Sequence, residues 1–512
     1  MNSINALPLH YSTNQRTIMI DLNSLIFITS VLILVSAIIA RLVDNIGIPT
    51  LILFLGIGMI ANNEKIIEFG FHTPQLTHSI ATIALIFIIF SGGLDTSWEQ
   101  TKSIVRHGVT LATIGVIITA LAVALFTTLF LGYSLMEGML LGSIISSTDA
   151  PAVFSILRSK KISLKGTMKP LLEFESGSND PTALFLTVMM ISFLSTGTFS
   201  LGTMFIQFIL QMTIGAVAGI LIGKGIVLLL NHIHFSYEGF YPVTLLACIT
   251  GLYAGTTLLN GNGILAVYIA GIVIGNSDVV QRRSLLRFFD GLAWLSQITM
   301  FVALGFLVTP SEIFAHAREG LIISAGLIFL ARPIGVFISL IPSKFSLREQ
   351  LFISWVGIRG SMPIILTTFL VISQVPDSYT IIRIVFFIVL TSALVQGWSI
   401  PYVARLLRVD APLPPSRRLP LEFETPKDSD TELYDFIIPY NSAAANKPIV
   451  ELGLPKDCLI VLIIRNERYI LPSGSTSLEP GDTILALVNK KNLDEFRSII
   501  TTGTNPAHSD LL

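Results

Sequence analysis

The chain has 512 residues, of which 52% are hydrophobic and only 13% are charged, whereas soluble domains are about 25% charged. Its net charge of −1 gives no indication of nucleic-acid binding. Charged residues are absent from long stretches such as 23–40 and 202–223. Because apolar segments of about 20 residues can span a bilayer as helices, we predict a polytopic membrane protein rather than a large soluble protein with buried helices.

Residues 1–22 are expected to form an N-terminal tail. They lack a basic start followed by an apolar run and a cleavage site, so a cleaved signal peptide is not expected. Met19 begins the stretch MIDLNSLIFITS, which is typical of a protein start. Residues 1–18 are therefore expected to be a disordered tail or to precede the true start.

Residues 23–408 are expected to form the transmembrane domain, with about thirteen spans whose boundaries are good to a few residues. The predicted spans are 23–40, 46–61, 79–95, 105–131, 136–158, 168–194, 202–231, 239–259, 262–276, 288–308, 318–341, 349–372 and 380–407.

Basic residues gather in alternate connections between these spans. They are Arg41, Lys102, Arg106, Arg158, Lys160, Lys161, Lys165, Lys169, Arg282, Arg283, Arg287, Lys344, Arg348, Arg405 and Arg408. Loops on the other side, such as STGTFS and QVPDSYT, are almost free of Lys and Arg. Because basic loops stay in the cytoplasm, we expect the N-terminus outside and the C-terminus in the cytoplasm. An odd number of spans agrees with this orientation.

The composition changes after Arg408. Residues 409–432 are rich in Pro and charge and are expected to be a linker. From 433 to 503 the pattern is that of a small cytoplasmic α+β domain, and 504–512 are expected to be a tail. The runs LYDFIIP, CLIVLIIR, ERYILP and TILALV are typical of short strands, and NLDEFRSII has a helical pattern.

The two cysteines do not indicate a disulfide or a metal site. Cys248 lies in an apolar span and Cys458 in the C-terminal region.

Polar residues inside spans carry the functional signal, because a carboxylate at the bilayer centre costs about 2.5–3.5 kcal/mol and persists only beside a partner or a water-filled path. In the fifth span, SSTDAPAV (146–153) places Asp149 two residues before Pro151. Proline removes a helical hydrogen bond, so carbonyls near Thr148 are expected to be free to coordinate a cation.

In the sixth span, EFESGSNDP (173–181) brings two acids close together in the sequence. Glu175 and Asn179 are four residues apart and share one helix face, and Ser176 and Asp180 share a neighbouring face. In the twelfth span, WVGIRGSMP (355–363) breaks the apolar run with two glycines, Arg359 and a proline. Breaks at similar positions in the two halves indicate inverted repeats whose interrupted helices meet at a mid-membrane site.

Taken together, STDAPAVFS, ESGSNDP, ARP and WVGIRGSMPI resemble the NhaP-type branch of the cation–proton antiporters over nearly all of residues 19–505. The likeness is to bacterial potassium/proton or sodium/proton antiporters with an appended C-terminal domain. It implies thirteen helices, with the fifth and twelfth crossing as broken helices, and a homodimer in the cell membrane.

The resemblance also implies roles for individual residues. Asp149 and Asp180 match the carboxylates that bind the monovalent cation or protons, and Thr148 and Ser176 match the family's oxygen ligands. Asn179 matches the asparagine that accompanies electroneutral exchange. The supporting residues that the resemblance implies are the buried ion pair of Glu175 with Arg332 and the arginine at the twelfth-span break, Arg359.

The sequence departs from the family at one position. Several relatives carry an acid just before the Gly-Gly of the third span, where this chain has Ser91, in FSGGLD. Asp95 lies four residues later, nearer the end of the span. One ligand of the usual set is therefore missing, and the choice of ion stays open.

The C-terminal region, ELGLPKDCLIVLIIRNERYILPSGSTSLEPGDTILALV, resembles the C-terminal half of potassium-conductance regulator (RCK) domains. This implies dimerisation or the sensing of a small regulatory ligand, and a passive oligomerisation module is the alternative.

These patterns predict a secondary antiporter that exchanges potassium, or sodium, for protons by alternating access, with no cofactor and no enzymatic activity. The alternative is an RCK-regulated potassium channel, although the chain has no filter sequence such as TVGYG. A second alternative is an intramembrane hydrolase using Ser176 or Ser178, which needs a positioned base. The histidines considered for that role, His232, His234 and His316, are expected in loops away from these serines.

Overall fold

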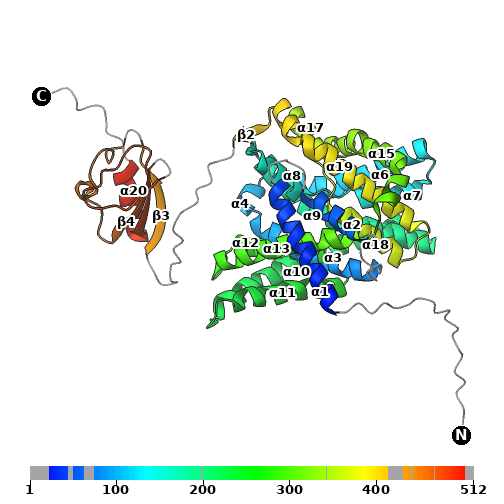
Figure 1. Ribbon diagram of the computed structural model, residues 1–512, viewed down its shortest axis with the longest axis horizontal. Helices are drawn as coiled ribbons and strands as arrows, with labels where there is room; N and C mark the ends of the chain where they lie inside the picture. Colours follow the sequence, from blue (N-terminus) through cyan, green and yellow to red (C-terminus); the bar gives the residue numbers. More distant parts are fainter. Residues whose placement is uncertain are drawn as a thin grey trace, which may run out of the picture. The chain divides into compact units, whose positions relative to one another are not determined.

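The computed structural model divides the chain into two compact units, Met1–Pro414 and Pro415–Leu512 (Figure 1). The structure describes residues 22–43, 50–62, 74–197, 200–341, 343–412, 431–439, 442–465 and 468–501. The predicted tails, apart from Leu22, and residues 413–430 of the predicted linker lie outside the described residues.

The described part of the first unit is almost entirely helical, as its apolar composition predicts. Its helices are α1 (Leu22–Val43), α2 (Thr50–Ala61), α3 (Pro74–Asp95), α4 (Trp98–Thr101), α5 (Val105–Thr110), α6 (Val116–Leu131), α7 (Leu135–Ile145), α8 (Ala150–Ser159), α9 (Met168–Thr196), α10 (Leu201–His232), α11 (Phe240–Leu258), α12 (Gly263–Gly275), α13 (Arg282–Gly305), α14 (Pro310–Ala315), α15 (Ala317–Gly326), α16 (Arg332–Ser339), α17 (Leu347–Trp355), α18 (Ser361–Ile372) and α19 (Ser378–Leu406).

Each of the thirteen predicted spans coincides with one of these helices or with a run of consecutive helices. Within the described residues, seven helices are long and apolar enough to cross a membrane, or eight if α7 and α8 form one bent span. Shorter apolar helices, including α2, α12 and α18, add to these. The membrane-spanning nature of the unit is confirmed, and the count of thirteen stays a prediction.

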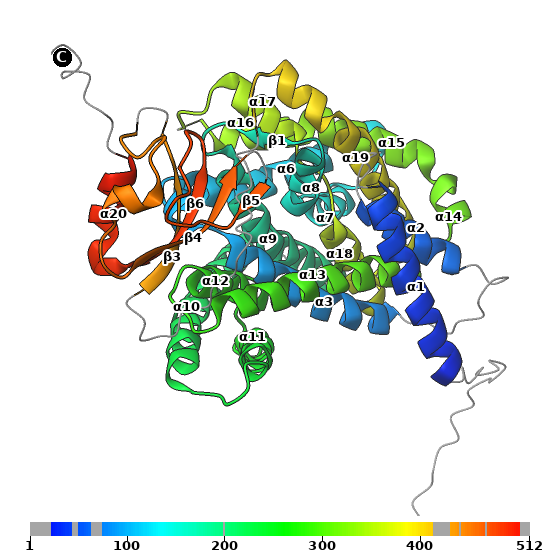
Figure 2. The same ribbon diagram turned by 60° about the vertical axis from the view of Figure 1, so that its left-hand side comes forward.

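The helices pack as two groups. The first group consists of α1–α3 and α10–α13, in which α3 lies against α12 and α13 (Figure 2). The second consists of α5–α9 and α15–α19. The groups meet mainly where α9 and α18 contact α3, α12 and α13. This interface is important below, because α9 and α18 carry the candidate site.

The second group contains the same order of elements twice, as the repeat hypothesis predicts. In each half a helix with a π-helical segment is followed by a broken helix and then by a 29-residue helix, α9 or α19. The π-helical segments are η1 (Leu111–Gly115), between α5 and α6, and η2 (Leu327–Ala331), between α15 and α16. Pro333, two residues after η2, lacks the N–H that a regular α-helix needs. This missing donor explains why the helix is π-helical at η2.

Glycines permit the closest approach within the first group. A Cβ at Gly93 on α3 would lie 2.6 Å from the carbonyl oxygen of Tyr268 on α12, and one at Gly271 would lie 3.0 Å from the Cα of Gly93. No larger side chain fits between these backbones. The Gly-Gly of FSGGLD therefore brings α3 and α12 into direct contact.

One short sheet in the first unit was not predicted. Strand β1 (Ile162–Leu164), between α8 and α9, pairs antiparallel with β2 (Asp410–Pro412), which follows α19. The first residues of the predicted linker therefore belong to the structure of the first unit. This pairing joins the connection between α8 and α9 to the segment that follows α19.

The second unit contains a four-stranded antiparallel sheet in the order β3-β6-β4-β5. Its elements are β3 (Thr431–Ile437), β4 (Cys458–Arg465), β5 (Arg468–Ile470), β6 (Thr483–Asn489) and α20 (Leu493–Thr501). Phe496 and Ile500 of α20 pack into the core on one face of the sheet, against residues such as Phe436. All four predicted strands and the helix are confirmed.

A buried carboxylate fixes the turn before β6. Asp482 is 1% exposed, and its carboxylate accepts hydrogen bonds from Arg465 Nε at 2.9 Å and Arg465 Nη2 at 2.8 Å. It also accepts the backbone N–H of Glu479 at 2.7 Å. The hydrogen bonds from Arg465 to Asp482 raise the pKa of Arg465 above its usual value. Arg465 thus joins β4 to the turn formed by residues 479–482 (EPGD).

We predict that Asp482→Asn destabilises this domain by about 2–3 kcal/mol, because hydrogen bonds to charged groups are lost. The change in the free energy of unfolding is measured by denaturant unfolding of the full-length protein, with proteolysis at sites in the domain as the readout. Glu479→Gln is the matched control, since Glu479 contacts the same arginine but is 52% exposed, and exposed pairs contribute about 0–1 kcal/mol. Equal effects of the two substitutions would contradict the stabilising role assigned to the buried Asp482 carboxylate.

Candidate functional site

The fifth predicted span is broken at the TDAP motif. Helices α7 and α8 are bent by 45°, with residues 146–149 between them. Asp149 caps α8, and its Oδ1 accepts the N–H of Ala152 at 3.1 Å. Pro151 fits in the first turn because that position needs no N–H donor. The sequence therefore ends one helix and starts the next with the acid at the junction.

The twelfth predicted span is broken as well. Helix α17 ends at Trp355 and α18 begins at Ser361. The two breaks touch, because the N–H of Asp149 donates to the carbonyl of Ile358 at 2.8 Å. The two interrupted helices of the repeats therefore meet, as predicted from the sequence.

Helix α9 supplies hydrogen bonds to the first break. The Ser176 hydroxyl donates to the carbonyl of Thr148 at 3.0 Å and accepts the N–H of Ala150 at 3.0 Å. Asn179 Nδ2 donates to the Thr148 hydroxyl at 2.7 Å. The two Ser176 bonds satisfy backbone groups that the break removes from helical pairing, and the Asn179 bond fixes the Thr148 side chain.

The second predicted acid lies on the same face of this junction. Asp180 is 9% exposed, and its Oδ1 accepts a hydrogen bond from the Ser147 hydroxyl. Ser147 stands two residues before Asp149 in the break. The structure thus brings Asp180, Thr148, Ser176 and Asn179 together in one hydrogen-bonded cluster at the break that carries Asp149.

A buried arginine reaches the same break from the other repeat. Arg359 is 1% exposed, and its Nη1 donates to the carbonyls of Ser146 at 2.5 Å and Ser147 at 2.7 Å. Its Nε and Nη2 have no partner among the described residues. The guanidinium therefore satisfies carbonyls at the end of α7 and places a buried positive charge at the first break.

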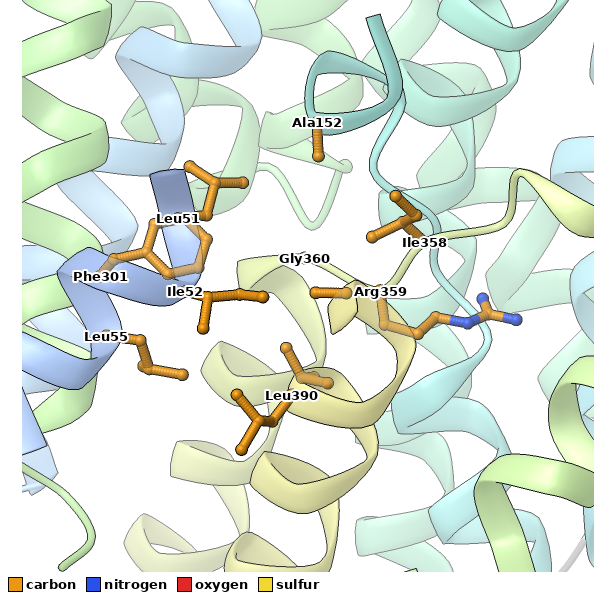
Figure 3. Close-up of a pocket in the computed structure, with 11 residues that line it drawn as sticks. Leu51, Ile52, Leu55, Ala152, Phe301, Ile358, Arg359, Gly360 and Leu390 are labelled. Atoms are coloured by element: carbon orange, nitrogen blue, oxygen red, sulfur yellow. The ribbon is translucent and has the colours of Figure 1, made fainter. Parts of the chain in front are cut away.

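Gly360 allows the second break to approach Asp149. A Cβ at this position would lie 2.0 Å from Asp149 Oδ2. Beside Gly360 is a small apolar pocket, lined also by Ala152, Ile358 and side chains of α2, α13 and α19. Figure 3 shows the Arg359 guanidinium directed away from the apolar side chains of this pocket.

Glu175 and Arg332 form the predicted buried ion pair. Arg332 Nη1 lies 2.7 Å from Glu175 Oε1, and Nη2 donates to Oε2 at 3.0 Å. The two side chains are 1% and 2% exposed. A Cβ at Gly357 would lie 2.9 Å from Arg332 Nε, so the glycine of the second break also makes room for this pair.

Some residues of the site were missed at the sequence level. On α19, the Ser392 hydroxyl accepts the N–H of Arg359 at 3.1 Å, and Gln396 Nε2 donates to the carbonyl of Trp355 at 2.7 Å. These residues bond to backbone groups of the second break, as Ser176 does at the first. Their signal was available, because they are polar residues four apart within an apolar span. Ser147, noted only as part of the motif, belongs to the same set.

The expectation that carbonyls near Thr148 are free is wrong in this structure. The Thr148 carbonyl accepts from Ser176, and the two preceding carbonyls accept from Arg359. A broken helix in lipid needs internal donors, and the neighbouring helices provide them. The side-chain oxygens are therefore better candidates for ion ligands than the carbonyls.

The hydrogen bonds of Ser176 go to backbone groups and involve no histidine, so the arrangement does not resemble an activated nucleophile. Two of the histidines expected in loops belong to helices or their ends. His232 lies in the last turn of α10 and His316 between α14 and α15.

Comparison with known proteins assigns the chain to a family. Residues 30–406 match the family described as sodium/hydrogen exchanger, transmembrane, and residues 433–501 match the TrkA-C domain. Since the first match covers most of the chain, this protein belongs to the sodium/hydrogen exchanger family. The predicted resemblance is confirmed for both units.

Among individual relatives, the K(+)/H(+) antiporter NhaP of Alkalimonas amylolytica is 37% identical over 94% of this chain and 84% of its own length. The K(+)/H(+) antiporter NhaP2 of Shewanella sp. (strain ANA-3) is 35% identical over the same shares. The solved structure of the sodium proton antiporter MjNhaP1 from Methanocaldococcus jannaschii at pH 8 has a TM-score of 0.65 and 26% identity. The match covers 75% of this chain and 98% of that one.

We predict that Gly360→Ala abolishes ion exchange, because the added Cβ overlaps the Asp149 carboxylate and must displace it. Gly92→Ala is the matched control, since Gly92 on α3 has no atom within 4 Å of an added Cβ. Exchange in proteoliposomes, together with the yield of each purified variant, measures the effect. Normal exchange by Gly360→Ala would show that the two breaks are not held as closely as described.

Breaking the buried ion pair should reduce stability more than it changes ion selectivity. Glu175→Gln leaves Arg332 without a counter-charge, which costs about 3–5 kcal/mol, so a lower yield and a lower melting temperature are expected. The double substitution Glu175→Gln with Arg332→Met should recover part of the loss. A stable Glu175→Gln variant with altered selectivity would instead place Glu175 among the ion ligands.

Proposed function

We propose that this protein exchanges a monovalent cation for protons across the cell membrane, and that Asp149 and Asp180 bind both in turn. The observation that carries the proposal is that Asp149 lies in the first break, where the two broken helices touch, and that Asp180 bonds to Ser147 of the same break, in a chain of the sodium/hydrogen exchanger family. Intramembrane acids of this kind mark ion and proton pathways.

Competition for one site couples the two ions. Without a cation, burial and mutual repulsion favour protonated carboxyl groups, whereas a bound cation favours the ionised forms. Cation binding therefore releases protons, and protonation releases the cation. The hydroxyls of Thr148 and Ser176 are the proposed additional ligands, and Asn179 holds Thr148 in place.

The balance of buried charge supports electroneutral exchange. Glu175 and Arg332 neutralise one another. Asp149, Asp180 and Arg359 together carry one negative charge when both acids are ionised. One monovalent cation or one proton then makes the site neutral, which lowers the cost of moving it within the membrane. We therefore propose that one charge is exchanged for one.

Potassium is the proposed substrate, with sodium as the alternative. The relatives NhaP and NhaP2, which match 94% of this chain, are K(+)/H(+) antiporters by name. The Na(+)/H(+) antiporter 1 of Methanocaldococcus jannaschii is 28% identical over 65% of this chain. Membership of an exchanger family also argues against a potassium channel.

Alternating access is proposed to occur by movement of the second helix group against the first. The site belongs to the second group, and α9 and α18 form much of the contact with the first. Rocking of a repeat around a bound ion is the usual mechanism of such transporters. We further propose an N-terminus outside, a cytoplasmic TrkA-C domain that senses a small ligand, and a homodimer.

We predict that Asp180→Asn inserts normally but abolishes exchange, because an amide cannot exchange a proton for a cation. Asp149→Asn should behave similarly. The assay is cation-driven proton flux in proteoliposomes with potassium, sodium, lithium and rubidium in turn. Asp278→Asn, in the connection before α13, is the control and should retain flux. Retained flux by Asp180→Asn would contradict the proposal that Asp180 is part of the ion-binding site.

A further inference from the structure

A lysine interrupts an otherwise apolar helix on the outer surface of the first helix group. Helix α10 has 32 residues, and Lys224 is its only Lys, Arg, Asp or Glu. The residue is exposed, and none of the ion pairs among the described residues includes it. Figures 1 and 2 show α10 at the edge of the helical unit. Because a charged side chain on a membrane-facing surface is costly without a counter-charge, a partner from outside this unit is expected.

The position of Lys224 along α10 corresponds to the edge of the hydrocarbon core. The preceding stretch 202–223 carries no charge. As a helix this stretch is about 33 Å long, which matches a hydrocarbon core of about 30 Å. About 12 Å of helix then remain between Lys224 and His232 at the end of α10. The ammonium group therefore lies near the depth of the lipid phosphates and not at the bilayer centre.

The end of α10 that carries Lys224 is a basic end of the unit. Asn231 Nδ2 donates to the carbonyl of Asp278 at 2.8 Å, and its Oδ1 accepts the N–H of Val280 at 3.0 Å. These bonds hold the connection before α13 beside the end of α10, and α13 begins with two arginines. Basic residues gather on the cytoplasmic side of a membrane, where anionic lipids give the surface a negative potential.

The surface around Lys224 fits a phospholipid. Ile220, Leu221 and Leu228 lie three or four residues from Lys224, so they share its side of α10, and all three are exposed. Acyl chains can pack along these apolar side chains while a phosphate contacts the ammonium group. Gly225 has no atom within 4 Å of an added Cβ. No side chain therefore covers the surface next to the lysine, and a head group can approach it.

A second copy of the chain is a poorer source of the counter-charge. Helices α1, α10, α11 and α12 of the first group contain no Asp or Glu. Glu238 and Asp278 lie in connections beyond the end of α10, and Glu238 already accepts a hydrogen bond from Gln281 Nε2 at 3.0 Å. A contact between copies through these membrane helices would leave Lys224 without a carboxylate. A phosphate from the bilayer is the partner that the charges favour.

We propose that Lys224 binds the phosphate of an anionic phospholipid, whose acyl chains lie along the exposed side of α10. The ammonium group is a point charge with three donors, which suits phosphate oxygens. An anionic lipid is favoured over phosphatidylcholine, because the phosphate of phosphatidylcholine is already balanced by its own choline. The site lies outside the ion path proposed above and does not depend on the antiport function.

The test uses the purified full-length protein in detergent, with its melting temperature measured as phosphatidylglycerol is added. For the unmodified protein we expect a saturable rise that phosphatidylcholine does not give. Lys224→Gln should increase the phosphatidylglycerol concentration at half of this rise about fivefold, as expected for one basic side chain at an anionic surface. Lys224→Arg keeps the charge and should stay within about twofold of the unmodified protein. Lys102→Gln, at an exposed lysine after α4, is the matched control and should leave the concentration unchanged.

Several results would overturn the proposal. They are a normal response of Lys224→Gln, an equal change in Lys102→Gln, and an equal rise with soluble glycerol phosphate, which has the phosphate without acyl chains. A melting temperature of Lys224→Gln that is lowered equally in both lipids would show a structural role for the lysine instead. If Lys224→Gln fails to fold, Lys224→Met decides, because it removes the charge and keeps an apolar chain towards lipid.

Light scattering after size exclusion tests the remaining partner. The oligomeric mass of Lys224→Gln in phosphatidylcholine should equal that of the unmodified protein. A smaller mass would show that Lys224 contacts a second copy of the chain, and the lipid site would be overturned.

Discussion

Backbone groups within a lipid bilayer must find hydrogen-bond partners inside the protein, since no water is available to satisfy them. Two interrupted helices create such groups at the centre of this protein, and the surrounding residues follow from that need. At the first break, Ser176 bonds to the Thr148 carbonyl and Asn179 to the Thr148 hydroxyl. At the second break, Ser392 and Gln396 bond to backbone groups. Arg359 bonds to carbonyls just after α7. Glycines then allow the two breaks to touch. The polar side chains that satisfy the two breaks belong to the same cluster that we propose as the ion-binding site.

Charge is balanced in the same region. Glu175 and Arg332 cancel within a buried ion pair, and this pair fixes α9 against α16. In the proposed charge count, Arg359 balances one of the two acids near the breaks. What remains is a single negative charge, which one monovalent cation or one proton can neutralise. A site that is neutral in both loaded states can move between the two sides of a membrane at a lower cost than a charged one. This charge count is the basis of the proposed electroneutral exchange.

The sequence predicted the parts of this arrangement that depend on local patterns. Apolar length located the helices, Pro151 and the glycines of WVGIRGSMP located the breaks, and alternating apolar residues located the strands of the C-terminal domain. Resemblance to a known family identified the acids and the ion pair. Contacts between distant segments were not predictable in this way. The polar spacing of Ser392 and Gln396 does not show what they bond to, because their partners belong to the second break. The β1–β2 pairing joins residues more than 240 positions apart. The carbonyls at Thr148 seemed free because their partners come from other helices.

The central claim is that one pair of acids holds either a cation or protons. Proton release on cation binding tests this directly, without transport. Potassium chloride is added to the purified protein in a weakly buffered detergent solution, and a pH indicator reports released protons, with choline chloride as the control for ionic strength. The account predicts that potassium releases protons, that its apparent affinity falls as the pH is lowered, and that Asp180→Asn shows neither effect. Potassium binding that calorimetry detects without any proton release would contradict it.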